Sequence, residues 1–349
     1  MQRLMDGYRG RAADGAVPEL RDRADVVAYA AYRMPATFGA VSAALGALAE
    51  RTGGWAPRSH LDVGGGTGAA LWAAAGVWAG TRHTTVLDRS PAALAVGREL
   101  AGTRGDLGDR PTGGGAAGGP ERGAAGGVEW RRGTLPPSAA DPLPEAELVT
   151  VSYVLGELDG ADRSALVESA AASARGAVVV VEPGTPDGYL RIRAAREQLT
   201  GAGLRILAPC PHGGRCPVEP GADWCHFAAR VPRSSLHRRA KGGTLPYEDE
   251  KFSYVAAVRT DAVEAAPAAG RIVRRPQQRK GQVLLDLCAT GPEELRRTTV
   301  SKRHGPLYRA ARDAGWGDAW PPDTRTPGTG SPETGSPDTG SSDTGSGDA

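Results

Sequence analysis

Apolar and polar positions follow one another in blocks that predict helices and strands in turn. Helical spacing of three and four runs through 20–34 and 36–50, and Pro35 is expected to break one helix from the next. Residues 59–76 predict a short strand, a glycine turn and a helix. Further strands are expected at 83–90, 128–135, 146–155 and 176–184, with helices at 91–102, 162–174 and 188–203. This alternation predicts a parallel, doubly wound α/β sheet with helices on both faces.

The pattern changes after residue 207, where short strands, loops and basic clusters follow. The segments "KFSYVAAVR" (251–259) and "GQVLLDLCA" (281–289) predict strands of a smaller, β-rich module. About half of 102–127 is glycine, which predicts a disordered insertion, and the polar repeats after 321 predict a disordered tail. The expected domains are an N-terminal helical region (1–55), a Rossmann-like domain (56–207), the smaller module (208–320) and the tail (321–349).

Composition indicates the class of protein and its cellular compartment. Its 40% hydrophobic content fits a globular protein, and no apolar run approaches the ~20 residues that a membrane span needs. The first residues lack the apolar core of a secretory signal. We therefore expect a cytoplasmic protein without membrane contact, monomeric when free. In that compartment a cysteine cluster favours metal binding or catalysis over disulfides.

Positive charge collects in the second half of the folded region. Residues 191–312 hold 23 Lys and Arg against 11 Asp and Glu, a balance of +12 in a chain whose net charge is +2. Such clustering favours contact with nucleic acid, and the scarcity of aromatics there favours backbone recognition over base stacking. The acidic run at 248–250 is expected to neutralise part of this charge. The candidate RNA-binding residues are Arg233, Arg238, Arg239, Lys241, Arg274, Arg275, Arg279 and Lys280.

The loop "LDVGGGTG" carries the clearest sign of a cofactor. Asp62 is followed by Gly64, Gly66 and Gly68 between a predicted strand and a helix, so the backbone can turn sharply and approach a ligand. Asp88 ends the second strand, where a carboxylate can accept ribose hydroxyls. An acid before the glycines resembles motif I of the S-adenosylmethionine-dependent methyltransferases. A dinucleotide, or a loop that binds neither cofactor, is the alternative.

No catalytic residue is assigned from the sequence. The [DN]-P-P-[YF] turn common in methyl transfer to base nitrogens is replaced by "SYVLGEL" (152–158), and no cysteine nucleophile lies near the fourth and fifth strands. Glu157 and Glu182 lie near the ends of predicted strands. We interpret them as pocket, capping or surface carboxylates in preference to general bases. Whether the chain transfers a methyl group is left open.

Three of the four cysteines lie within eighteen residues. Cys210 and Cys216 are separated by five residues, Cys216 and Cys225 by eight, and Cys288 lies in a predicted strand further on. Four thiolates suit a four-ligand metal site, and these spacings depart from the C-x₂₋₄-C knuckles of structural zinc. The cysteine pattern has three interpretations: an iron–sulfur cluster, a zinc site, or buried cysteines that bind no metal. His212 and His226 are expected to support the site rather than to bind metal.

Eight segments in order carry a resemblance to a known family. They are "RMPATFGAV", "LDVGGGTG", "EPGTPDG", "CPHGGRCP", "DWCHF", "LPYEDEKFSYV", "RRPQQRKG" and "VSKRHGPLYRAARDAGWGD". From about residue 20 to 320 the chain resembles the methyltransferase-like family associated with the small ribosomal subunit, whose mitochondrial members are assembly factors of that subunit. The resemblance implies an S-adenosylmethionine fold, binding of small-subunit rRNA, and a 4Fe-4S cluster on Cys210, Cys216, Cys225 and Cys288.

Together these features predict a ribosome-associated, methyltransferase-like protein in which a cluster shapes a basic, RNA-facing surface. The protein would act as an rRNA methyltransferase or as an assembly factor. A small-molecule methyltransferase with a structural zinc module is one alternative, disfavoured by the balance of +12 in 191–312. An RNA-binding chaperone whose glycine loop binds nothing is the other.

Overall fold

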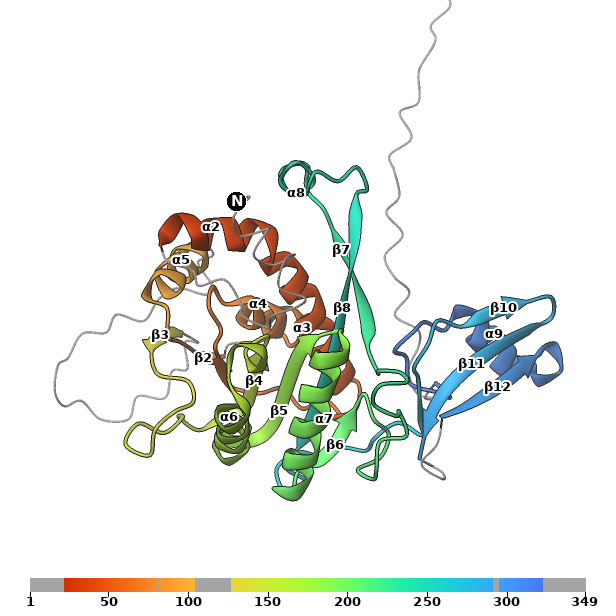
Figure 1. Ribbon diagram of the computed structural model, residues 1–349. Coiled ribbons are helices and arrows are strands. Elements are labelled where there is room, and N and C mark those ends of the chain that lie inside the picture. Colours follow the sequence, from red (N-terminus) through yellow and green to blue (C-terminus); the bar gives the residue numbers. More distant parts are fainter. Residues whose placement is uncertain (1–21, 81, 104–126, 291–294, 323–349) are drawn as a thin grey trace, which may run out of the picture.

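The computed structural model describes residues 22–80, 82–103, 127–290 and 295–322 (Figure 1). The predicted Gly-rich insertion and repetitive tail lie almost wholly outside the described residues. The boundaries drawn for the four domains stay predictions.

A mixed eight-stranded sheet forms the body of the protein. Its order is β3-β2-β1-β4-β5-β8-β6, with β7 paired to β8. Strands β1 to β5 pair in parallel, as predicted for a doubly wound sheet. Their bounds are β1 Ser59–Val63, β2 His83–Asp88, β3 Val128–Arg132, β4 Ala146–Ser152, β5 Ala174–Pro183 and β6 Arg205–Ala208.

One strand corrects the sequence analysis. β8 (Tyr247–Val258) contains the segment expected in the smaller module, yet it pairs antiparallel with β5 and β6 inside the large sheet. Its seven last residues are all buried, because helices cover both faces of a central strand.

Helices cover both faces of the sheet (Figure 1). α6 (Gly160–Ser173) and α7 (Pro186–Gly201) contact β4, β5 and β8 on one face. α3 (Met34–Ala49) and α4 (Ala69–Val77) cover the other face, and α5 (Pro91–Gly102) contacts β2 and β3. α2 (Arg23–Tyr32) precedes α3, and Arg33 separates them. Pro35 thus lies in the first turn of α3, where its missing N–H costs nothing, and does not itself break the helix.

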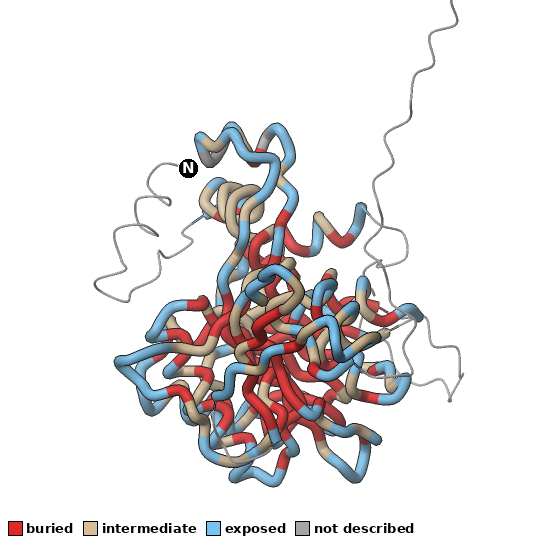
Figure 2. Tube along the Cα trace, turned by 90° about the vertical axis from the view of Figure 1, so that its right-hand side faces the viewer, coloured by how far each residue is buried: buried red, intermediate tan, exposed pale blue. Residues whose placement is uncertain are grey.

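The core lies on both sides of the central strands. Figure 2 shows the buried residues gathered in the middle of the molecule, with exposed residues around them. One cluster joins β4 and β5 to Leu166 and Leu199 beneath α6 and α7. The second joins the same strands to Leu45 and Leu48 of α3. Because β5 alternates Val178 and Val180 into the first cluster with Val179 and Val181 into the second, its apolar run is continuous.

A hairpin arm projects from this body (Figure 1). It comprises β7 (Phe227–Pro232), the short helix α8 (Ser235–Lys241) and the first half of β8, paired from Phe227↔Phe252 to Pro232↔Tyr247. The residues 247–251 alternate between exposed and partly buried. The arm is therefore a two-stranded ribbon with a polar surface.

A second sheet of four strands follows. It contains β9 (Gly270–Ile272), β10 (Gln277–Arg279), β11 (Gln282–Ala289) and β12 (Leu295–Ser301), followed by the 3₁₀ helix η3 (Lys302–His304) and α9 (Pro306–Asp313). Ile272, Leu285 and Trp320 belong to its separate small core. Within the described residues no helix combines the length and the apolar character that a bilayer span requires.

Candidate cofactor pocket and cysteine pocket

The glycine loop follows β1, which β2 and β4 flank on either side. The order of the strands reverses at this point of the sheet. Ligands of doubly wound sheets bind at this point, beyond the carboxyl ends of the strands. A cavity of about 570 Å³ opens there, a size typical of small-molecule sites. Asp62, Gly64, Gly66 and Asp88 line it, whereas Gly68 does not. The structure therefore brings together four of the five predicted cofactor residues.

The loop requires glycine for two separate reasons. Gly64, Gly66 and Gly68 adopt φ values of 67°, 54° and 86°, which other residues rarely adopt. Gly65 is needed for space instead, because a Cβ there would lie 2.5 Å from Asp62 Oδ2. Sequence reasoning did not single out Gly65, although it sits in the same motif. Gly68 begins α4 and packs near Trp130.

Asp62 is held by a buried chain of polar groups. The Thr150 hydroxyl donates to Asp62 Oδ1 at 2.8 Å, and His60 Nε2 lies 2.8 Å from the same hydroxyl. Because the hydroxyl proton goes to Asp62, His60 must donate through Nε2. Asp62 Oδ2 is buried and has no hydrogen-bond partner among the described residues. It is thus an acceptor left for a ligand.

Burial controls the charge of Asp62. Loss of water raises the pKa of this carboxyl from 3.8 to about 7; the Thr150 hydroxyl opposes the rise and the charge of Asp88 adds to it. Burial also lowers the pKa of His60 to about 3, so the imidazole is neutral. A cationic group placed beside Asp62 would favour its ionised form.

Asp88 shapes the opposite side of the loop. Its Oδ2 accepts from the backbone N–H of Gly66 at 2.9 Å, and its Oδ1 accepts from that of Ser90 at 2.7 Å. Burial raises the pKa of Asp88, and these backbone donors counteract the rise. The carboxylate therefore fixes the loop and still faces the cavity.

Several residues that line the cavity were missed from the sequence. Tyr29 of α2 and Thr37 of α3 line it, so the N-terminal helices form part of its wall. Tyr153 follows β4 with φ 61°, a left-handed conformation that is strained for a bulky side chain and common at functional sites. The hydroxyl of Tyr153 donates to Glu250 of β8 at 3.0 Å. Thr37 and Tyr153 lie in the segments 33–41 and 152–158 that the sequence singles out, whereas Tyr29 lies in neither.

The two candidate bases have different surroundings. Glu157 lines the cavity and pairs with Arg89 at 3.2 Å, and burial raises its pKa to about 7. Glu182 is fully buried, accepts from the Leu155 N–H at 3.0 Å and pairs with Arg191 at 2.6 Å. Glu182 therefore caps the turn at Leu155 and does not line the cavity.

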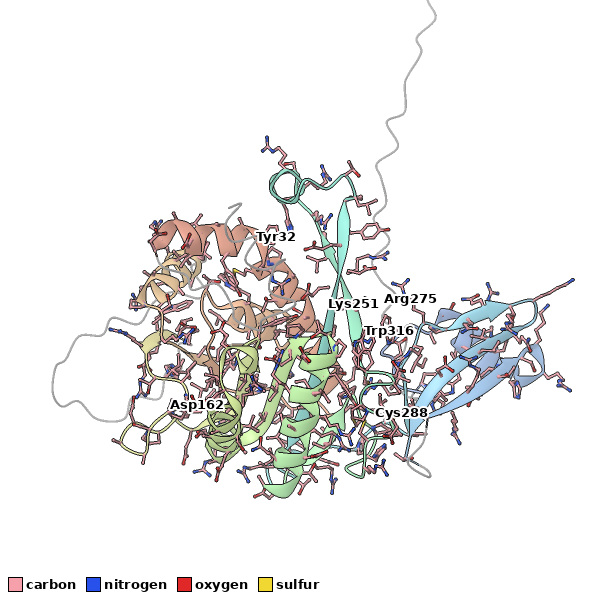
Figure 3. All side chains as sticks on the ribbon, viewed as in Figure 1. Tyr32, Asp162, Lys251, Arg275, Cys288 and Trp316 are labelled. Atoms are coloured by element: carbon pink, nitrogen blue, oxygen red, sulfur yellow. The ribbon has the colours of Figure 1, made fainter. Side chains whose placement is uncertain are left out.

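All four cysteines line a second pocket, of about 40 Å³, beneath α7 and beside the small sheet. Cys288 lies at the junction with the small sheet, with Trp316 and Arg275 labelled nearby in Figure 3. The Tyr189 hydroxyl donates to the Val218 carbonyl at 3.0 Å and lies 3.4 Å from Cys216 Sγ. The four thiols form no disulfide. Sequence spacing alone could not show that Cys288 joins the other three.

The pocket's polar frame is built from arginines and loop carbonyls. The Arg196 guanidinium donates to the carbonyls of His212 and Gly214, and Arg271, which is 1% exposed, donates to that of Pro209. Burial raises the pKa of Cys288 to about 12, and the nearby thiols Cys210 and Cys216 add to the rise. Cys288 is therefore protonated unless a cation lies beside it.

The geometry does not match a single-ion site. Among the described residues, no three or more His, Cys, Asp or Glu side chains are arranged to hold one metal ion. His212 Nε2 lies 3.5 Å from Cys288 Sγ, and His226 stacks on Trp224 with ring centroids 5.1 Å apart. The metal-binding character expected of the smaller module, and the four ligands, stay predictions.

The predicted RNA-binding residues fall into two groups. Three arginines are engaged by carboxylates: Arg233 by Glu248 at 2.6 Å, Arg275 by Asp249 at 3.4 Å, and Arg274 by Asp223. The acidic run thus neutralises part of the basic charge, as expected. The others with described side chains lie apart from carboxylates, at two places: Arg238 and Arg239 at α8, Arg279 and Lys280 at β10. The side chain of Lys241 lies outside the described residues.

Comparison with known sequences gives a coherent set of relatives. The human protein "Ribosome assembly protein METTL17, mitochondrial" is 29% identical over 305 residues, covering 84% of this chain and 62% of its own length. "Rsm22-cox11 tandem protein 2, mitochondrial" of Schizosaccharomyces pombe is 34% identical over 190 residues, 42% of this chain and 24% of that protein. The chain thus spans less than two thirds of these relatives.

Solved structures are matched only distantly. A magnesium protoporphyrin IX methyltransferase from Synechocystis with bound SAM has TM-score 0.36 and 14% identity, over 73% of this chain and 90% of that one. An O-methyltransferase family protein from Burkholderia thailandensis has TM-score 0.39 and 15% identity, over 68% and 59%. At these scores the likeness carries no weight, and the fold follows from the strand order itself.

A sequence model of one family covers most of the described chain. It is described as "Mitochondrial small ribosomal subunit Rsm22" and matches residues 23–111 and 124–321. The expected cytoplasmic location is wrong on this comparison, because the family and the relatives above are named as mitochondrial. The chain belongs to the Rsm22 family of the mitochondrial small ribosomal subunit.

Proposed function

We propose that this protein is a small-subunit ribosome assembly protein that binds S-adenosylmethionine, holds a 4Fe-4S cluster and contacts rRNA. One observation carries the proposal: the family match spans both the glycine-loop cavity and all four cysteines. The human relative is named as a ribosome assembly protein. A protein that retains both pockets and the family sequence around them is best explained by that role.

The residues of the glycine-loop cavity suit S-adenosylmethionine, which supplies an electrophilic methyl group when bound. Asp62 Oδ2 is a buried acceptor without a partner among the described residues and would take the ligand's ammonium group. Asp88 would accept the ribose hydroxyls beside the Gly66 turn. Tyr29 and Thr37 would cover the ligand from the N-terminal helices and exclude water. The side chains alone do not identify a methyl acceptor.

The cysteine pocket suits an iron–sulfur cluster better than a single ion. Four thiols are the usual donor set of a 4Fe-4S cluster, and Cys210, Cys216, Cys225 and Cys288 line one pocket. The spacings of five and eight residues between Cys210, Cys216 and Cys225 depart from the knuckles of structural zinc, which favours the cluster over a zinc ion. The group would tie the 210–225 loop to β11 of the small sheet.

Three measurements test the proposal. Isothermal titration of the full chain with S-adenosylmethionine should give binding that Asp88→Ala abolishes. Protein purified without oxygen should contain iron and sulfide, and Cys216→Ser should lose both, whereas Ser169→Ala, at a half-buried site of α6 outside the cysteine pocket, should keep them. Co-sedimentation with small ribosomal subunits should weaken as salt rises. A chain that contains neither iron nor sulfide and does not sediment with subunits would disprove the role.

A further inference from the structure

Four cations meet at the far end of the small sheet. Lys280 and Gly281 form the turn between β10 and β11, closed by the pair Arg279↔Gln282, and Gly281 has φ 78° as a type II turn requires. The backbone N–H of Lys302 donates to the Gly281 carbonyl at 3.1 Å. Arg279 and Lys280 therefore lie beside Lys302 and Arg303, and these four residues are the distal tip.

The distal tip is supported by packed structure. Val283 and Val300, which pair across β11 and β12 just behind it, are 1% and 2% exposed in the small core. Ser301 and His304 form a reciprocal cap that begins η3. The backbone that carries the cations is thus fixed before any partner binds, so little ordering entropy remains to be lost. The tip points away from the large sheet, opposite the Cys288 end of β11 (Figures 1 and 3).

The charge of the distal tip is uncompensated. All four side chains are exposed, and in the described part of the chain no carboxylate lies within ion-pair distance of any of them. The nearest acid along the strands, Asp286, is taken by Arg297 at 2.7 Å. Arg230 and Arg233 of the hairpin arm differ, because carboxylates hold them at 2.9 and 2.6 Å.

We propose that the distal tip binds the phosphate backbone of double-stranded RNA. The inference rests on the proposed function, which it deepens by assigning the contact to Arg279, Lys280, Lys302 and Arg303. Four clustered cations match closely spaced phosphates, and each contact releases a condensed counterion. None of the four residues is aromatic, and the neighbouring His304 ring is held by the Ser301 N–H at 2.9 Å, so the tip lacks the Phe, Tyr and Trp platform of single-strand binders and the aromatic anchors of protein interfaces.

The test uses the full chain and a fluorescent hairpin RNA with a 20-base-pair stem of arbitrary sequence. Anisotropy titrations between 50 and 300 mM KCl give the slope of log Kd against log salt. The variant R279Q/K280Q/K302Q/R303Q should bind more weakly and lower that slope by about 3 to 4, roughly 0.9 for each phosphate contact. The pairs R279Q/K280Q and K302Q/R303Q should each give about half the effect, and they serve if the fourfold variant unfolds.

The matched control removes the same charge elsewhere. R23Q/R58Q/R175Q/R297Q replaces four arginines, each more than half exposed and each paired with a carboxylate. It should change the slope by less than about 1.

Each other outcome has one meaning. Equal losses in both fourfold variants would show a general charge effect and overturn the assignment. Unchanged RNA binding by the tip variant would overturn it while leaving the proposed function intact. A wild-type chain that binds no RNA would instead refute the RNA contact of the proposed function. Displacement of the RNA from the tip by a lower concentration of poly-glutamate than of unlabelled RNA would reassign the surface to an acidic protein.

Discussion

Asp62 is expected to reduce the stability of the folded protein at neutral pH. Its carboxyl is fully buried, and the pKa rises from 3.8 in the unfolded chain to about 7 in the fold because burial disfavours the charge. The folded state therefore holds a proton that the unfolded state releases. The free energy of unfolding must fall as pH rises from about 4 to about 7, and it is level above that.

The magnitude follows from the two pKa values. Between pH 4.5 and pH 8 the wild-type chain should lose about 3 kcal/mol of stability through Asp62 alone. Asp62→Asn removes this titration and keeps an acceptor for the Thr150 hydroxyl. The new amide N–H groups would lack a partner at the former Oδ2, which costs about 1 to 3 kcal/mol at every pH. The stability of the variant relative to the wild type should therefore rise by about 3 kcal/mol across this pH range.

Urea unfolding of both chains at several pH values checks this expectation. Asp88, Glu157 and Glu182 also have raised pKa values, but they remain in both chains and cancel in the difference. If the difference in unfolding free energy between the variant and the wild type is the same at pH 4.5 and pH 8, Asp62 ionises normally and the reasoning from burial is wrong.

The same carboxylate gives a binding prediction. If the ammonium of S-adenosylmethionine requires ionised Asp62, affinity scales with the ionised fraction, which rises about tenfold between pH 5 and pH 6 for a pKa of about 7, while the ligand's amino group stays protonated. Titration calorimetry should show that tenfold gain, and Asp62→Asn should bind weakly at both pH values. Binding by the variant that equals the wild type would show that the ligand does not use this group.

Two further changes test the packing around the cavity. Gly65→Ala should destabilise the chain by about 1 to 3 kcal/mol in urea unfolding, because its Cβ would lie 2.5 Å from Asp62 Oδ2. The control Gly46→Ala lies in a helix with no atom within 4 Å of the new Cβ, so it should be neutral or stabilising. Equal effects of the two substitutions on the free energy of unfolding would contradict this expectation. Arg191→Met should cost about 3 to 5 kcal/mol at pH 8 and less at pH 5, because the buried Glu182 carboxylate loses its ion pair and can then be neutralised only by protonation.

The sequence predicts the helices and strands of the first 207 residues well, because each has a clear period and most have a cap. Ser90 and Asp159, for example, accept from the N–H groups that begin α5 and α6. It cannot predict which strand neighbours which when the strands are distant in sequence. The short apolar run within 251–259 fits a strand of a small module as well as a central strand of the large sheet. Only tertiary packing assigns β8 to the large sheet.

In the candidate sites, too, local sequence motifs are predictable and contacts between distant segments are not. The glycine loop is recognisable because its residues are contiguous and their backbone needs are specific. The walls contributed by Tyr29 and Thr37 come from helices whose sequence shows only an amphipathic pattern. Basic residues are visible in the sequence, but their partners are not, so Arg233 and Arg279 look alike until Glu248 is found beside the former.

The position of β8 explains why the block "LPYEDEKFSYV" combines acids with an apolar run. Its outer half holds the arm and the cofactor wall together: Glu250 accepts from Tyr153 at 3.0 Å and pairs with Arg33 at 3.1 Å. Its inner half reaches the cysteine pocket, where the Ser253 hydroxyl donates to the Cys225 carbonyl at 2.8 Å and Tyr254 lines the wall. Because neighbouring residues of one strand point to opposite faces, β8 holds the cavity wall residue Tyr153 through Glu250, lines the cysteine pocket with Tyr254, and still fills the sheet. One strand therefore connects the two pockets, although the sequence suggests two separate modules.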